Sequence, residues 1–397
     1  MNMDLPRRSD LAKYWQLDKN TVFLNHGSFG ATPIEILNKQ DIYRQKIEKD
    51  PVKFFERDYV DYWKKSIISL SEFINANPEG LVFIPNATSG VNTVLKNLDL
   101  KPGDQIIVTD HTYQACRNIV DFVTKKMDAE TVVVEIPFNV RNEQEVVDLV
   151  LNSVCDRTVL ALIDTVTSPT GMKMPFEKII KKLDEENIDV LLDAAHGAGI
   201  INLDVNKINA AYVTGNCHKW LCTPKGSAFL HIREDKKKNF RPLNISHGAS
   251  FKGSAQEKFE FEFSWSGTYD PTPWMCIPDS IRHMRSMVDG GWDEIMKRNT
   301  ELAVKGRNIL CQELDIKAPF PDNMVSAIAS IELPDKEIPP FSIQGDPLHN
   351  KLLDEYSIQV PIFPWELHDT RYIRISSQLY NHEDEYVYLA KALNECV

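Results

Sequence analysis

Short apolar runs alternate with amphipathic segments along the middle of the chain. The apolar runs are about four to eight residues long, which is typical of buried strands. In the segments between them, apolar residues recur with helical spacing. Strands are predicted at residues 81–84, 105–109, 131–137, 158–163, 190–192, 210–214 and 227–232, with helices at 91–95, 142–154 and 176–186. This alternation predicts a three-layer α/β/α domain with a mostly parallel sheet.

The pattern changes on either side of this region. Helices are expected at 34–49, where Asp50-Pro51 stops the helix, and at 60–74. From Trp274 onward the expected elements are helices at 275–288, 292–314, 346–355 and 383–394, with strands at 327–333 and 372–376. We therefore expect a large domain over residues 21–274 and a smaller α+β C-terminal domain over 275–397. Residues 1–20 are expected to pack with the small domain.

Composition narrows the possible partners and location. The 397-residue chain has a net charge of −12, which argues against nucleic acid or an anionic membrane as a partner. Its seven cysteines show no pairing pattern, the start of the chain lacks a signal-peptide core, and no run of 18 apolar residues occurs. We expect a soluble protein in the cytoplasm. Cys217-His218 and Cys222 have no second Cys/His pair at zinc spacing, so no metal site is expected.

Two strand ends within residues 190–224 carry the main chemical signal. Asp193 follows one predicted strand, and Lys219 follows the next. In a parallel sheet both groups lie at the carboxyl edge, where ligands bind. Pyridoxal phosphate (PLP) needs such a pair: an amine for the Schiff base, and a carboxylate that keeps the pyridine nitrogen protonated. Taken singly, a solvated lysine and a turn-forming aspartate are the ordinary interpretations.

Other segments supply the remaining parts of such a site. Thr88 and Ser89 open a predicted helix after a strand, which suits an anion site but also an ordinary N-cap. Tyr113 or His111 follows another strand and is placed to stack on a ring, unless it is a plain loop aromatic. A polar cluster at 164–171 is a candidate for bonding the phenolate oxygen of the cofactor.

Two further features concern the substrate. The loop at 25–30 is either a Gly turn or a cover over a substrate pocket. Arg374, on the strand at 372–376, is either a solvated edge residue or a bidentate clamp for a carboxylate.

With these residues in place, the sequence resembles the class V aminotransferase family of fold-type I PLP enzymes. Within that family it looks most like the branch of isopenicillin N epimerase, ergothioneine-pathway C–S lyases and cysteine desulfhydrases. The resemblance covers nearly the whole chain. Its marks are LNHGSFG at 24–30, NAT at 86–88, DAAH at 193–196, NCHK at 216–219 and RIS at 374–376.

The resemblance implies a role for each matching residue. Lys219, Asp193 and His196 would be catalytic, with Lys219 forming the Schiff base and moving the α-proton. The cofactor-binding set would be Ala87, Thr88, Ser89, Tyr113 (rather than His111, in the stacking position), Ser168, Asp193, His196, Asn216, His218, Lys219 and Thr268. The substrate-binding set would be Asn25, His26 and Arg374, the last on the α-carboxylate. Thr268 resembles a residue that reaches the phosphate of a partner subunit, so a homodimer with active sites at the subunit interface is implied.

The expected substrate is an amino acid, and the expected reaction is C–S β-elimination on cysteine or an S-substituted cysteine. An epimerase of the isopenicillin N type and an aminotransferase are the alternatives. No thiol nucleophile of the desulfurase kind is evident, because Cys276, Cys311 and Cys396 fall in predicted helices or at the chain end. A nucleotide-binding oxidoreductase would need G-x-G-x-x-G, which Gly197-Ala198-Gly199 does not complete. A non-catalytic scaffold would be expected to lack the lysine or the aspartate.

Overall fold

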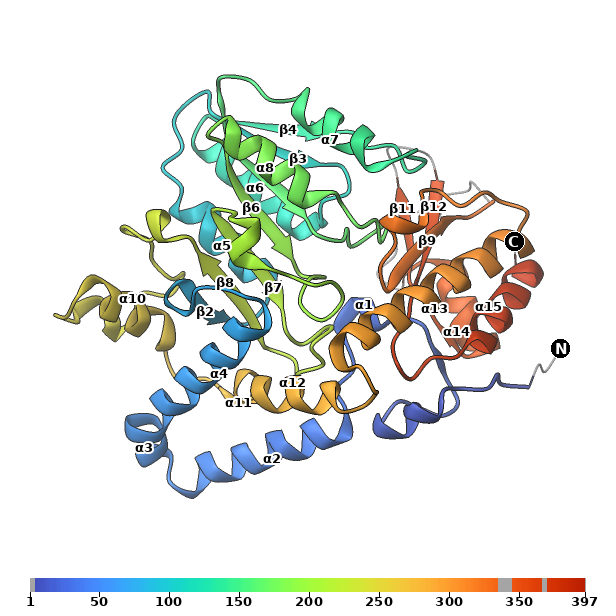
Figure 1. The fold of residues 1–397 in the computed structure, drawn as a ribbon, viewed down its shortest axis with the longest axis horizontal. Helices are drawn as coiled ribbons and strands as arrows, with labels where there is room; N and C mark the ends of the chain where they lie inside the picture. The colour runs from blue at the N-terminus through green and yellow to red at the C-terminus, as the bar shows by residue number, and fades with distance from the viewer. Residues whose placement is uncertain (1–3, 335–344, 366–369, 397) are drawn as a thin grey trace.

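A seven-stranded sheet forms the centre of the molecule (Figure 1). The structure is a computed structural model that describes residues 4–334, 345–365 and 370–396. The strand order is β2-β8-β7-β6-β5-β3-β4; β8 pairs antiparallel with both β2 and β7, and the other neighbouring pairs are parallel. The strands are β2 (Leu81–Ile84), β3 (Gln105–Thr109), β4 (Glu130–Val134), β5 (Thr158–Asp164), β6 (Asp189–Ala194), β7 (Tyr212–Asn216) and β8 (Ala228–Ile232). The predicted α/β class and mostly parallel sheet are confirmed.

Helices cover both faces of this sheet. The chain moves in one direction across the sheet from β2 to β4 and in the other direction from β4 to β7. Because parallel crossovers are right-handed, this reversal puts the first helices on one face and the later ones on the other. The first set is α5 (Ala87–Asn97) and α6 (Gln114–Lys126); the second is α7 (Glu143–Leu151), α8 (Phe176–Glu185) and α9 (Val205–Ile208). The predicted three layers are therefore present.

Strand register brings the chemically important residues to one edge. In the parallel β5–β6 pair Asp164 lies opposite Asp193, and in the β6–β7 pair Asp193 lies opposite Thr214. Asp164 ends β5 and Asp193 is the last but one residue of β6, so both lie at the carboxyl edge, where a parallel sheet opens toward a ligand crevice; Thr214 lies in the middle of β7. The residues that follow β7, including Lys219, therefore begin beside Asp193.

The C-terminal part of the chain forms a second, smaller sheet with its own helices (Figure 1). Its antiparallel order is β11-β12-β9. The elements are β9 (Ile328–Glu332), β11 (Ile362–Trp365), β12 (Thr370–Ser376), α13 (Gly291–Glu313), α14 (Pro347–Tyr356) and α15 (Glu383–Cys396). Near the N-terminus, β1 (Val22–Phe23) pairs with β10 (Ile358–Gln359), so the start of the chain lies beside this C-terminal part. The domain boundaries stay predictions, and their outermost residues, 1–3 and 397, lie outside the described residues.

The remaining helices lie between these two sheets or at the edge of the molecule. They are α1 (His26–Phe29), α2 (Ile34–Lys49), α3 (Pro51–Lys53), α4 (Tyr59–Phe73), α10 (Ala255–Ser264), α11 (Thr272–Met275) and α12 (Ile277–Arg285), with a π-turn at Phe54–Asp58 and 3-10 turns at Asp10–Tyr14, Pro78–Gly80, Glu234–Lys236, His247–Ser250 and Asp322–Met324. Helix α10 was not expected in a polar, Gly/Ser-rich stretch. A capping box between Ser254 and Glu257 starts it, and Phe259 and Phe263 bury its apolar side.

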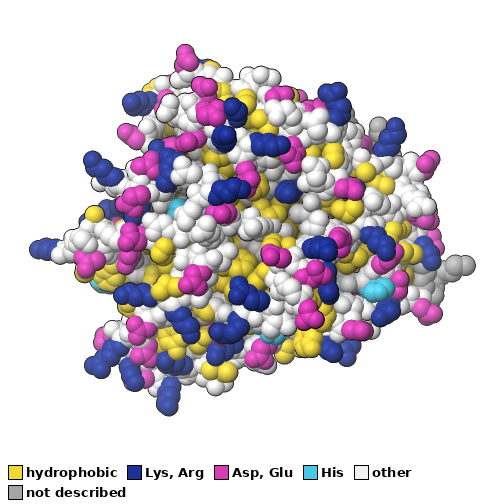
Figure 2. Space-filling view, viewed as in Figure 1, with side chains coloured by type: hydrophobic (Ala, Val, Ile, Leu, Met, Phe, Trp, Pro, Cys, Tyr) yellow, Lys and Arg dark blue, Asp and Glu magenta, His cyan; other side chains and the backbone are white. Residues whose placement is uncertain are grey.

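Two observations concern the surface and the helices of the described residues. Within the described residues, no helix is long and apolar enough to cross a bilayer. On the face shown in Figure 2, basic and acidic side chains are interspersed rather than gathered by sign. The expected cytoplasmic location stays a prediction.

Close packing of α5 on β7 generates a prediction about stability. A Cβ on Gly90 would lie 2.0 Å from Thr214 Oγ1 and 2.7 Å from Ile84 Cδ1. Both neighbours are held in the packed sheet, so Gly90→Ala should lower the free energy of unfolding by about 1–3 kcal/mol. Lys96→Ala, on the exposed side of the same helix, should change it little. Urea titration of both variants checks this, and equal stability would show that the contact relaxes freely.

Candidate active site

One cavity at the carboxyl edge of the large sheet contains most of the predicted site. It has a volume of about 470 Å³. The predicted residues that line it are Ala87, Thr88, Tyr113, Ser168, Asp193, His196, Asn216, His218, Lys219 and Arg374. Ser28, Phe29, Asn86, Cys116, Asp164, Ala195 and Phe363 complete the lining. Lys219 and Asp193, 26 positions apart, thus face a common space.

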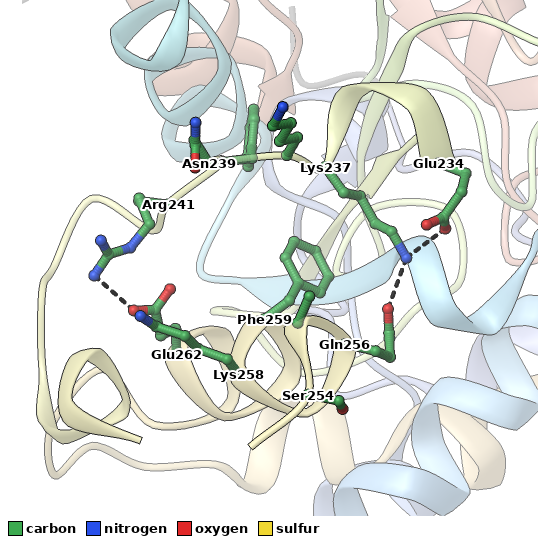
Figure 3. Close-up of a pocket in the computed structure, with 12 residues that line it drawn as sticks. Glu234, Lys237, Asn239, Arg241, Ser254, Gln256, Lys258, Phe259 and Glu262 are labelled. Carbon is green, nitrogen blue, oxygen red and sulfur yellow. Dashed lines mark hydrogen bonds and ion pairs between the residues drawn. The ribbon is translucent and has the colours of Figure 1, made fainter. Parts of the chain in front are cut away.

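A larger cavity of about 860 Å³ lies elsewhere, between the segment after β8 and helix α10 (Figure 3). Its cations are largely engaged: Lys237 contacts Glu234 and Gln256, and Arg241 pairs with Glu262. None of the predicted site residues lines it. We therefore place the candidate active site in the smaller cavity, where an amine, carboxyls and a guanidinium converge.

The amine of Lys219 is held by a defined chain of hydrogen bonds. The indole N–H of Trp220 donates to His196 Nδ1 at 3.1 Å, since an indole can only donate. The neutral His196 ring therefore carries its proton on Nε2, which lies 3.0 Å from Lys219 Nζ. Nζ must accept that hydrogen bond, and an amine can accept only in its uncharged form.

Burial also favours the uncharged form of the Lys219 amine. Removal from water, followed by the nearby charge of Arg374, lowers the pKa of Lys219 to about 7, while Asp193 opposes the shift. Burial also holds the pKa of His196 well below its usual range, with the charges of Lys219 and Arg374 adding to the effect. Near neutral pH a large fraction of Lys219 is thus a free amine, the nucleophilic form.

His26 supports the Lys219 backbone and is not among the residues that line the cavity. Its Nε2 bonds the Lys219 carbonyl at 2.9 Å, and its Nδ1 lies 2.9 Å from the Tyr380 hydroxyl. Burial lowers the pKa of His26 to about 3, so it stays neutral. Gly30 also approaches this segment: its φ is +70°, and a Cβ there would lie 2.1 Å from the His218 carbonyl oxygen. The predicted loop at 25–30 therefore braces the lysine segment.

Asp193 lines the same cavity as the N-terminus of α5. Its Oδ1 accepts the Ala195 amide at 2.8 Å, and its Oδ2 accepts only a long thiol contact from Cys116 at 3.4 Å. Burial raises the pKa of Asp193, while these donors and Lys219 oppose the rise. A cationic nitrogen beside Oδ2 would stabilise the ionised carboxylate in this dry setting.

Asp164 provides a second buried carboxyl next to Asp193. Burial and the charge of Asp193 raise its pKa well above the usual range. Its Oδ2 has no hydrogen-bond partner among the described residues. The sequence placed Asp164 only in a general polar cluster; its pairing with Asp193 depends on strand register.

The part of the cavity lined by the N-terminus of α5 is suited to an anion. Asn86 caps α5 by accepting the Ser89 amide at 2.8 Å, and Asn216 accepts the Ala87 amide at 2.9 Å. The Thr88 amide and hydroxyl have no partner among the described residues and lie at the positive end of the helix. His218 donates from Nδ1 to the Ser227 carbonyl at 2.8 Å, which leaves Nε2 free. Ser89 itself does not line the cavity.

Arg374 lies inside the cavity wall without an acidic partner. It donates to the Ser168 carbonyl, to Ser28 Oγ at 2.9 Å and to Asn25 Oδ1 at 3.3 Å. Within the described part of the chain, no carboxylate lies within ion-pair distance, whereas Arg371 on the same strand pairs with Asp346 at 3.0 Å. Burial lowers the pKa of Arg374 to about 10, so it remains charged. A buried guanidinium held only by neutral acceptors is suited to an incoming carboxylate.

Two predicted residues are more exposed than the rest. Tyr113 lies at the cavity mouth and is 46% exposed. Thr268 lies on the exposed link between α10 and α11, outside the cavity of its own chain. The sequence did not predict four residues of the site or its support: Trp220, Tyr380, Cys116 and Phe363. Each contacts a site residue that is distant in sequence. Trp220 could have been noticed because it directly follows Lys219.

Comparison with known proteins places this geometry in context. Residues 63–338, more than half of the chain, match the family model "Aminotransferase class-V". A probable chloroplastic L-cysteine desulfhydrase from Arabidopsis thaliana is 28% identical over 96% of this chain and 84% of its own. Isopenicillin N epimerase from Amycolatopsis lactamdurans is 27% identical over 96% of both chains, and hercynylcysteine sulfoxide lyase from Schizosaccharomyces pombe is 24% identical over 97% of both.

A solved structure supports the same fold. The cystine C–S lyase C-DES, in complex with its reaction product cysteine persulfide, superposes with a TM-score of 0.77 at 20% identity, over 94% of this chain and 97% of its own. The folds therefore agree over nearly the whole length. On the strength of the family match, this chain belongs to the class V aminotransferase family.

Proposed function

We propose that this protein cleaves the C–S bond of cysteine or an S-substituted cysteine by PLP-dependent β-elimination. The observation that carries the proposal is the convergence of Lys219, Asp193 and Arg374 on one cavity. As a class V aminotransferase family member it is a PLP-dependent enzyme. The choice of β-elimination is supported by the relatives named as a cysteine desulfhydrase and a sulfoxide lyase.

The donor set of the cavity fits PLP. The unpartnered Thr88 amide at the α5 N-terminus suits a phosphate, and Asp193 Oδ2, with only a thiol contact, suits a protonated ring nitrogen. Lys219, which lines the same cavity, suits the aldehyde, and Tyr113 offers a ring face. When bound, PLP supplies an electron sink for the pair left at the α-carbon.

Side chains of the cavity would bind the substrate and move its α-proton. Arg374 would hold the α-carboxylate, so that the α-hydrogen faces Lys219. His196 Nε2–H would hold the amine in place between turnovers, and Lys219 Nζ would accept the α-proton after its lone pair is released from that hydrogen bond. The C–S bond then breaks, and the sulfur leaves with the bonding pair and takes up a proton. Addition of one water gives pyruvate, ammonia and a thiol, which balances the reaction.

We also propose that the enzyme works as a homodimer. Thr268 is exposed in its own chain, and the surrounding segment carries exposed apolar side chains, Ile245, Phe251, Phe261 and Tyr269. Such a group on one segment suits a second protein surface. In a dimer of this kind Thr268 would serve the phosphate site of the other copy.

Product analysis in deuterated water tests the reaction. Incubation with S-substituted cysteines should release pyruvate and thiol in equal amounts, and Lys219→Ala should release neither while Lys101→Ala, on an exposed turn, behaves as the unaltered enzyme. Deuterium at Cα with loss of optical rotation would instead support the epimerase, and amino-group transfer to a keto acid would support the aminotransferase.

Arg374→Lys tests the carboxylate anchor. Losing the guanidinium from a buried charge pair costs about 2–5 kcal/mol, which is roughly a 30-fold or larger fall in kcat/KM. The loss should appear mainly in KM, because the anchor binds the substrate throughout the reaction. The exposed Arg282→Lys is the control. An unchanged KM would place the carboxylate elsewhere.

The protonation of Lys219 should make the rate of PLP incorporation depend on pH. Because burial lowers its pKa to about 7, the free amine becomes the main form above that pH. The rate at which the apoenzyme incorporates PLP should therefore rise between about pH 6 and 8 and level off above it. Stopped-flow absorbance follows this step without any substrate. A rate that keeps climbing toward pH 10 would mean an ordinary, solvated lysine.

A further inference from the structure

A side cleft adjoins the candidate active site. It has a volume of about 420 Å³ and shares Tyr113, Ser168 and Phe363 with the cavity that holds Lys219. Its other lining residues are Asp110, Thr112, Gln114, Pro169, Pro364 and Trp365. None of these six has a role in the proposed reaction, so the cleft is room that the elimination step does not need.

Arg374 marks the boundary between the two spaces. It donates to the Ser168 carbonyl, and its guanidinium lies 4.9 Å from the centre of the Phe363 ring. Ser168 and Phe363 are two of the three residues that both spaces share. An amino acid held by its carboxylate on Arg374, with its nitrogen toward Lys219, therefore has its side chain free to enter the cleft.

The lining of the cleft favours a flat group. Tyr113, Phe363 and Trp365 offer aromatic faces and edges, which pair well with another ring. Trp365 is fixed by edge contacts with His111 at 4.7 Å and Tyr372 at 5.4 Å between ring centres. A fixed aromatic wall binds a rigid ring at a low cost in side-chain ordering.

The charges that line the cleft disfavour a substrate with an acidic side chain. Among the described residues that line the cleft, Asp110 is the one acidic residue, and none is a lysine or an arginine. An acidic group would enter without a cation to pair with, which is costly in a partly buried space. A neutral ring, or a cationic one attracted by the aromatic faces, would not meet this cost.

We propose that the side cleft binds the sulfur substituent of the substrate, and that the preferred substrate is a cysteine with an aromatic, non-acidic group on sulfur. This inference rests on the proposed β-elimination. It sets such cysteines above free cysteine, which leaves the cleft unfilled, and above S-carboxymethyl-cysteine, which places a carboxylate in it.

The first test is a substrate panel with the holoenzyme. The kcat/KM for S-benzyl-cysteine should exceed that for cysteine and for S-carboxymethyl-cysteine by roughly tenfold or more, as expected for filling an apolar pocket. The α-methyl analogues lack the proton that Lys219 removes, so their dissociation constants report binding apart from chemistry. These constants should follow the same order.

Two substitutions of opposite charge at one residue then test whether the sulfur substituent binds in the side cleft. Gln114 begins α6 at the edge of the cleft, is exposed, and donates to Asn118 at 2.7 Å. Gln114→Lys should raise the preference for S-carboxymethyl- over S-benzyl-cysteine by roughly two- to fivefold, and Gln114→Glu should lower it. Gln144 on α7 makes the same i,i+4 bond, to Asp148 at 2.7 Å, so Gln144→Lys and Gln144→Glu are matched controls.

The outcomes separate the two proposals. If elimination occurs but cysteine is preferred, or if the Gln114 variants treat all substrates as the Gln144 variants do, the side cleft is not the subsite while β-elimination stands. If no substrate yields pyruvate, the proposed function falls, and the α-methyl binding order still decides whether the cleft takes aromatic groups.

Discussion

The site depends on keeping one lysine amine uncharged inside the protein. Desolvation disfavours the ammonium form of Lys219, and the neighbouring Arg374 disfavours it further. The hydrogen-bond direction set by Trp220 through His196 requires the same uncharged state. Desolvation, the charge of Arg374 and the direction of the hydrogen bonds thus all favour the uncharged amine. A solvated lysine in the same sequence would be a poor nucleophile at neutral pH.

The cavity wall carries both acidic and basic side chains. Asp193 and Asp164 lie side by side, and burial together with the charge of Asp193 raises the pKa of Asp164 well above its usual range. Arg374 supplies a fixed positive charge at another wall with neutral acceptors around it. The cavity is therefore prepared for a ligand that is anionic at two points and cationic at a third. An amino acid joined to a phosphorylated pyridine ring has that distribution.

Support for the site comes from both parts of the chain. The loop at 25–30 carries Asn25 and Ser28 to Arg374 and His26 to the backbone of Lys219. Arg374 itself lies on β12 of the small sheet, whereas Lys219 follows β7 of the large one. A shift of the small sheet would therefore move the carboxylate anchor relative to the amine. Gly30, which has no room for a side chain, brings this loop close to the backbone of His218 and Lys219.

The sequence alone determined the alternation of strands and helices, and with it the parallel sheet and the strand-end positions of Asp193 and Lys219. These follow from local periodicity and from motifs contiguous along the chain. Tertiary structure decided that Asp164 pairs with Asp193, that His26 bonds the lysine backbone, that Thr268 lies outside its own cavity, and that α10 is a helix. Such features depend on strand register and on contacts between distant segments, which residue spacing along the chain does not encode. The fold was thus predictable from local pattern, while the arrangement of charge and of space around the site was set by packing.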